Sequence, residues 1–214
     1  MWLAADDYLQ MTYIERMLAV LESDPGLVTC VSRVSLVRPD GNSKLAVGTF
    51  QLQADTVTNL ATYLAYLANP HDNSRVYGLH HTDPLKRAFP TGDFLTAFDW
   101  ALMAGTLLCG RHAEVPETLM VRDETPREAY LNMTRREARW WLERIIPLPP
   151  MSLDLLFRQR IPLRLPVVKA LFYVNIAMHF EYARAFHPRY SRLEPFVRRH
   201  LLWRLANRPA ASAD

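Results

Sequence analysis

Cysteine and glycine are scarce in this chain of 214 residues, which contains 2 Cys and 7 Gly. Cys30 and Cys109 lie far apart and lack C-x-x-C spacing, so the sequence predicts neither a disulfide framework nor a zinc site. The glycines form no G-x-G-x-x-G, P-loop or G-x-S-x-G motif, which leaves oxidoreductases, ATPases and hydrolases of those types without support. The cysteine usage fits a reducing cytoplasm.

Long hydrophobic runs are also missing. The most apolar later stretch, from Leu165 to Phe180, is interrupted by Lys169, Asn175 and His179 and is short for a membrane span. The first residues contain acidic side chains by position 7 and no basic segment ahead of an apolar one, which argues against a signal peptide. We therefore expect no transmembrane helix and a cytoplasmic location, and peripheral contact at the inner face of the cell membrane stays open.

Charge is distributed unevenly along the chain. Residues 1–121 contain 8 Lys and Arg against 13 Asp and Glu, a net charge of −5, whereas residues 122–214 contain 17 against 9, a net charge of +8. Such a split often marks a surface that meets phosphate groups, anionic lipid or nucleic acid. Arginines that only solvate the outer faces of helices explain it equally well. The basic residues are interrupted by acids and do not alternate with aromatics, so we expect no nucleic-acid binding.

The first half of the chain alternates helical and extended patterns. Helices are expected at 12–23, from 55 or 56 to about 69, and at 94–109, and a short helix is expected to begin at 82. Strands are expected at 27–37 and 76–80, with short extended pieces at 112–115 and 118–121. The apolar positions of the first helix are Ile14, Met17, Leu18 and Leu21. The turn signal Pro39-Asp40-Gly41-Asn42 predicts a hairpin or loop after the strand at 27–37.

Strand signals stop beyond residue 125. Helices are expected at 127–146, 152–159, 166–186 and 192–206, with prolines at 147, 149 and 150 as a break. The chain is therefore predicted to be an α/β protein with one domain at 1–126 and a basic helical region at 127–214.

An Asp pair, Asp6-Asp7, follows the apolar run of residues 1–5. If that run is a strand, both carboxylates lie near its C-terminal end, where open α/β sheets bind ligands. Mg²⁺ is commonly held by one or two carboxylates, with substrate phosphates and water as the other ligands. The sequence therefore predicts a Mg²⁺ or Mn²⁺ site at Asp6 and Asp7.

Several short motifs follow this pair in order. They are Tyr13-Ile14-Glu15-Arg16, Asp24-Pro25, Val76-Tyr77-Gly78-Leu79, Asp99-Trp100-Ala101-Leu102, Gly110-Arg111, Glu114-Val115-Pro116-Glu117-Thr118-Leu119 and Arg122-Asp123. In this order, over residues 1–126, the chain resembles the glycosyltransferase family 2 enzymes, whose GT-A domain transfers a sugar from a nucleotide-diphosphate donor. The resemblance implies a partial GT-A-like sheet that lacks the early nucleotide-binding strands and carries a C-terminal helical appendage.

The resemblance also implies roles for single residues. Asp6 and Asp7 would hold the metal and the diphosphate, and Asp99 would act as general base on the acceptor hydroxyl. The residues expected to contact substrates are Trp2, Tyr77, Gly78, His80 and Arg122. Two of these assignments have simpler explanations, because an acid at a helix start is favoured by the helix dipole and His80 is also explained as an ordinary polar loop residue.

Two functions of different class stay open. The first is a glycosyltransferase-like enzyme, either active or truncated and inactive alone, that uses a nucleotide-sugar donor and a glycan or lipid-phosphate acceptor. Its basic C-terminal helices would then meet the membrane surface. The second is a non-catalytic remnant that binds a partner subunit or a second copy of itself through an exposed sheet edge and apolar face.

Overall fold

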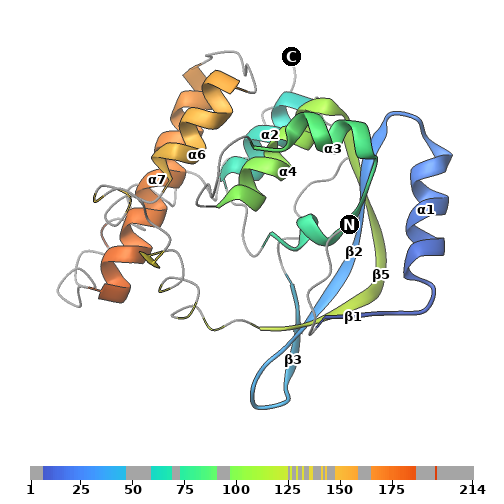
Figure 1. The fold of residues 1–214 in the computed structure, drawn as a ribbon. Coiled ribbons are helices and arrows are strands. Elements are labelled where there is room, and N and C mark those ends of the chain that lie inside the picture. The colour runs from blue at the N-terminus through green and yellow to red at the C-terminus, as the bar shows by residue number, and fades with distance from the viewer. Residues whose placement is uncertain are drawn as a thin grey trace.

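The computed structural model describes residues 7–46, 59–68, 73–90, 97–124, 148–158 and 165–186, with isolated residues between 126 and 143 and at 196. Over these residues the chain is an α/β protein with a mixed sheet and helices on both of its faces (Figure 1). The strands are β1 (Tyr8–Leu9), β2 (Leu27–Val37), β3 (Ser43–Leu45), β4 (Leu79–His80) and β5 (Arg111–Asp123). The helical elements are α1 (Tyr13–Ser23), α2 (Asn59–Ala68), the 3₁₀ helix η1 (Ser74–Tyr77), α3 (Thr82–Ala88), α4 (Phe98–Cys109), α6 (Pro149–Leu153), the π-helical η2 (Asp154–Arg158) and α7 (Leu165–Phe186).

The centre of the sheet is the parallel pair β2 and β5. β1 pairs antiparallel with the other edge of β5, and β3 and β4 pair antiparallel with the other edge of β2. The two short pieces predicted at 112–115 and 118–121 are one continuous strand. Ser32 pairs with Val115 and Arg33 with Thr118, so Pro116 and its neighbour form a bulge, as expected for a residue that has no N–H to donate.

Helix α1 covers one face of the sheet. The predicted helix and its end before Asp24 are confirmed, but its buried face is rotated from the expected one. Tyr13, Met17 and Leu21 are buried, whereas Ile14 and Leu18 are 45% and 41% exposed. Tyr13 can turn inward because its hydroxyl donates a hydrogen bond to the carbonyl oxygen of Tyr77 at 2.8 Å, which satisfies the polar end of a buried ring.

The strand expected at 76–80 is wrong over most of its length. The segment from Ser74 to Tyr77 is a 3₁₀ helix, and β4 contains only Leu79 and His80. Valine and tyrosine favour a strand locally, but tertiary contacts determine the conformation of this segment. The backbone runs so close to β2 at Gly78 that an added Cβ would lie 2.6 Å from the carbonyl oxygen of Cys30.

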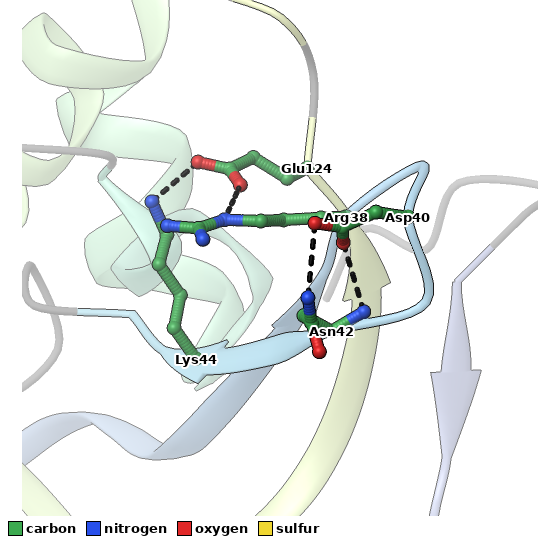
Figure 2. Close-up of polar contacts among 5 residues, drawn as sticks. All are labelled: Arg38, Asp40, Asn42, Lys44 and Glu124. Carbon is green, nitrogen blue, oxygen red and sulfur yellow. Dashed lines mark hydrogen bonds and ion pairs between the residues drawn. The ribbon is translucent and has the colours of Figure 1, made fainter.

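The hairpin between β2 and β3 follows the predicted turn. Gly41 has a φ of 82°, a conformation that glycine adopts without strain. Figure 2 shows Asn42 bound to the Asp40 carboxylate through its backbone N–H at 2.9 Å and its side-chain Nδ2 at 3.0 Å. In the same view the Glu124 carboxylate accepts hydrogen bonds from Arg38 Nε, at 3.0 Å, and from Lys44 Nζ.

The C-terminal helices share a hydrophobic core with α2 and α4. Val167, Leu171 and Val174 of α7 belong to the same buried cluster as Tyr63 and Leu67 of α2. The predicted helix at 166–186 is confirmed as α7, and the one at 152–159 corresponds to α6 and η2. The apolar run at 1–5 and the helix predicted at 192–206 lie outside the described residues, as does most of 127–146. Among the helices described, none is both long and apolar enough to cross a bilayer.

Candidate functional site

Arg122 in β5 is the centre of the candidate site. Its Nε donates to Asp7 Oδ1 at 3.3 Å, and its Nη2 donates to the Tyr77 hydroxyl at 2.7 Å. Its guanidinium carbon also lies 3.8 Å from the centroid of the Tyr77 ring, which is cation–π geometry. Its positive charge favours the ionised form of Asp99. We call Asp7, Tyr77, Asp99 and Arg122 the Arg122 cluster.

The secondary structure explains why these residues meet. Tyr8 pairs with Val121 in the antiparallel β1–β5 ladder, so the same register places Asp7 opposite Arg122. Tyr77 ends η1, where Tyr13 of α1 holds its backbone carbonyl. The side chains of Arg122 and Asp7 are 16% and 3% exposed, so their ion pair is shielded from water and interacts more strongly than one on the surface.

Asp99 is held at the start of α4. Burial raises the pKa of its carboxyl above the ordinary value, because an ionised carboxylate is less stable away from water. A hydrogen bond from Asn73 Nδ2 to Asp99 Oδ2 at 2.9 Å, the backbone N–H of Trp100 and the charge of Arg122 oppose this shift and favour ionisation. A buried carboxyl with a raised pKa is a candidate for proton transfer.

Asn73 is a site residue that the sequence did not indicate. It is fully buried with a φ of 48°, and its Oδ1 accepts a hydrogen bond from the Tyr66 hydroxyl at 2.6 Å. Its side chain therefore connects α2 to Asp99. Asparagine is among the few residues that adopt this left-handed conformation readily, and that preference is the only sequence signal that could have pointed to it.

Of the two residues predicted to hold a metal ion, the structure describes only Asp7. Asp6 lies outside the described residues, and the Asp7 carboxylate is engaged by Arg122. The part of the chain that the structure describes contains no group of three or more His, Cys, Asp or Glu residues placed to hold a metal ion. Asp7 by itself therefore fits a guanidinium pair better than a metal, and the metal prediction depends on Asp6.

The other predicted substrate contacts either have structural roles or lie outside the described part. Trp2 is not among the described residues. Gly78 is buried, and its lack of a side chain serves the close approach to β2. Both ring nitrogens of His80 are engaged: Nε2–H donates to the Val76 carbonyl oxygen at 3.1 Å, and Nδ1 accepts from the Thr29 hydroxyl at 2.9 Å. Burial lowers the pKa of His80 to about 4, so this histidine is neutral at pH 7.

A buried polar layer joins the sheet to α4 and η1. His112 in β5 is fully buried, with Nε2 donating to Thr106 Oγ1 at 3.1 Å and Nδ1 lying 3.5 Å from Nη1 of Arg75. Arg75 in turn forms an ion pair with Glu114. Sequence reasoning missed this layer because its members come from three separate elements, and no motif connects Arg75 in η1 to its partners in β5.

Comparison with known proteins adds no relative: the chain matches no family model, no curated protein and no solved structure. We therefore infer its function from the residues and contacts of the chain itself.

Proposed function

We propose that this chain is a glycosyltransferase-like protein with a GT-A-like fold that transfers a sugar from a nucleotide-diphosphate-sugar donor to a hydroxyl of a glycan or lipid-linked acceptor. The observation that carries the proposal is the Arg122 cluster, in which Arg122 contacts Asp7 and Tyr77 and its charge favours the ionised form of Asp99 at the start of α4. Support also comes from the order of the motifs that resembles family 2 glycosyltransferases.

In this proposal Asp99 accepts the proton of the acceptor hydroxyl as its oxygen bonds to the anomeric carbon, and the nucleoside diphosphate departs with the electron pair of the broken bond. The raised pKa of Asp99 makes it a better proton acceptor once it is ionised. Arg122, oriented by Asp7 and Tyr77, supplies positive charge toward the departing diphosphate. A Mg²⁺ or Mn²⁺ ion held by Asp6 and Asp7 would offset the same negative charge when bound.

Calorimetric titration with a panel of nucleoside diphosphates and nucleotide sugars, in Mg²⁺ or Mn²⁺, tests the binding half of this proposal. We expect at least one ligand to bind the wild-type protein. Arg122→Lys should weaken that binding by about tenfold, because lysine keeps the charge but loses a charge-assisted hydrogen bond. Asp7→Ala should weaken it as well.

The control is Asp83→Asn, since Asp83 is an exposed acid in the first turn of α3 and should not affect binding. Circular dichroism and the unfolding temperature show whether each variant is folded. If the wild-type protein binds none of the panel, or if Arg122→Lys binds as well as wild type, the proposal is wrong.

A second candidate function, partner binding without catalysis, is favoured by a separate observation. Tyr8 is 72% exposed and Met11 is fully exposed, next to the outward-facing Ile14 and Leu18. Among the described strands β1 pairs only with β5. Such an edge and surface suit a second copy or a partner subunit. Light scattering that shows a stable monomer would rule out the second copy, whereas a dimer that dissociates in Leu18→Ser would support it.

A further inference from the structure

Arg75 of η1 is a fully buried arginine that is not a member of the Arg122 cluster. Its side chain forms an ion pair with Glu114, and its Nη1 donates toward Nδ1 of His112 at 3.5 Å. Burial lowers the pKa of Arg75 to about 10, so the guanidinium is charged at pH 7. Because a buried ion pair is often no more stable than apolar side chains of similar volume, filling the core does not explain this pair.

The partners of Arg75 lie on one face of β5. His112 and Glu114 are two residues apart in a regular stretch of this strand, so their side chains point to the same side of the sheet. On that side His112 also contacts Thr106 Oγ1 of α4 at 3.1 Å. Arg75 therefore fastens η1 to the first half of β5, beneath α4.

Both ends of η1 reach the Arg122 cluster. Asn73, the residue before η1, donates Nδ2 to Asp99 Oδ2 at 2.9 Å. Tyr77, the last residue of η1, accepts a hydrogen bond from Arg122 Nη2 at 2.7 Å. With three residues per turn, the side chains of Arg75 and Tyr77 leave the helix in different directions. They attach η1 to β5 at two points, one near the start of the strand and one near its end.

A helix as short as η1 depends on such contacts for its position. It has four residues, and the hydrogen bonds of a 3₁₀ turn have poorer geometry than those of an α-helix. We infer that Arg75 and Glu114 are positioning residues, whose ion pair fixes η1 against β5 and thereby sets where both ends of η1 meet the Arg122 cluster. A part for that cluster in sugar transfer rests on the proposed function, whereas its positioning is measurable without any activity.

Glu114→Gln tests the inference, because it removes one charge of the pair and keeps the shape of the side chain. The measurement is carbon-13 NMR titration of the Asp99 carboxyl. If η1 shifts, the hydrogen bond from Asn73 weakens, and the pKa of Asp99 should rise by about 0.5 or more. A direct effect of charge has the opposite sign, since loss of the negative Glu114 would favour the ionised form of Asp99 and lower its pKa.

The other end of η1 provides a second readout. The Arg122 guanidinium carbon lies 3.8 Å from the centroid of the Tyr77 ring, so the ring shields the side-chain protons of Arg122 in the NMR spectrum. In Glu114→Gln these signals should move toward the positions of an exposed arginine. A pair that only adds stability would leave both the Asp99 titration and the Arg122 signals of the folded protein as in wild type.

The double variant Arg75→Met and Glu114→Met separates positioning from stability. Glu114→Gln leaves a buried charge without its ionic partner and should lower the unfolding temperature, whereas the double variant removes both charges and should stay folded, as circular dichroism will show. Because methionine cannot replace the ion pair or the hydrogen bond to His112, the Asp99 pKa should rise in the double variant as well.

The matched control is Glu117→Gln, which makes the same change in the same strand at an exposed residue paired with Arg16 at 3.9 Å. It should leave the Asp99 titration and the Arg122 signals unchanged. An Asp99 pKa in the double variant equal to that of wild type, or a lowered one in Glu114→Gln, would overturn the inference. Failure of the proposed function gives a different result, in which nucleotide sugars do not bind but the Asp99 pKa still rises in both variants.

Discussion

At the scale of single residues, Asn73 is the most constrained member of the candidate site. It is fully buried in a left-handed backbone conformation, and it accepts from Tyr66 while donating to Asp99. A residue that only filled space would not need both a donor and an acceptor in the same side chain. Asn73 therefore acts as a positioning residue: its hydrogen bond orients the Asp99 carboxyl and favours the ionised form.

Asn73→Ala should raise the pKa of Asp99 further, because it removes a hydrogen bond that favours the ionised carboxylate. Carbon-13 NMR titration of the Asp99 carboxyl measures this shift without requiring an active enzyme. The substitution also removes the acceptor of the Tyr66 hydroxyl, so the free energy of unfolding should fall by about 1–3 kcal/mol.

Asn42→Ala is the matched control, since Asn42 also donates its Nδ2 to an aspartate but does so in the exposed hairpin of Figure 2. Its substitution should leave the Asp99 titration unchanged and lower the free energy of unfolding by less than about 1 kcal/mol. An Asp99 pKa that is the same in wild type and Asn73→Ala would show that Asn73 does not tune this carboxyl.

At the scale of secondary-structure elements, β2 separates two different interfaces. Thr29 pairs with both His80 in β4 and His112 in β5, so the three side chains form a row on the face covered by η1 and α4. The next residue, Cys30, points to the other face, where its Sγ lies 3.7 Å from Met17 Sδ of α1. Alternation along one strand thus gives a polar interface on one side and an apolar one on the other.

The histidine row predicts a loss of stability in acid. Burial lowers the pKa of His80 from 6.5 to about 4, and burial next to Arg75 lowers that of His112 well below 6.5. Below pH 6.5 the unfolded chain therefore binds more protons than the folded one, and stability falls as pH decreases through this range. Each histidine should contribute a slope of up to about 1.4 kcal/mol per pH unit.

Urea unfolding at a series of pH values between 7.5 and 4.5 measures this slope. The two buried histidines together contribute to the slope, so His80→Gln and His112→Gln should each remove about half of that contribution. His81→Gln, at an exposed neighbour, should not change the slope. A slope below pH 6.5 that is unaffected by either buried substitution would contradict the assignment of acid sensitivity to this row.

Gly78 gives a second prediction for these elements. An added Cβ would lie 2.6 Å from the Cys30 carbonyl oxygen and 2.7 Å from Val31 Cγ1, so Gly78→Ala must push η1 and β4 away from β2. The free energy of unfolding should fall by about 1–3 kcal/mol. Gly41→Asn is the comparison, because Gly41 has open space around it and asparagine tolerates its positive φ. Chemical denaturation of both variants should show the larger loss for Gly78→Ala; equal losses would contradict the close approach.

At the scale of the whole molecule, the local sequence was enough to predict the elements whose ends are marked by turn residues or glycine. β2 was predicted with both of its ends, as were the hairpin at Gly41 and the end of α4 at Gly110. The errors occur where contacts with distant parts of the chain determine the local conformation. η1 was mistaken for a strand because the contact of Gly78 with β2 is not visible in the sequence, and α1 faces inward through Tyr13 because of a hydrogen bond to Tyr77.

The residues of the candidate site were also predicted only in part. Asp7 was selected because an acid pair follows the apolar run at the start of the chain, and the family resemblance added Tyr77, Asp99 and Arg122. The structure places Asp7 and Tyr77 in contact with Arg122. Asn73 was missed, as was the layer formed by Arg75, His112 and Glu114, because partners brought together by a parallel crossover are far apart in the chain. The metal ion, the donor and the acceptor stay predictions, as does the domain boundary at 126.

Release of nucleoside diphosphate shows whether Asp99 accepts a proton within the Arg122 cluster. It is measured with a panel of nucleotide sugars, with water in place of the acceptor hydroxyl and with Mg²⁺ or Mn²⁺ present. We expect release by the wild-type protein, a rate lower by about 100-fold or more in Asp99→Asn, and the wild-type rate in Asp83→Asn, which changes the corresponding first-turn residue of α3. Release at the same rate by Asp99→Asn and wild type, or no release from any donor, would contradict it.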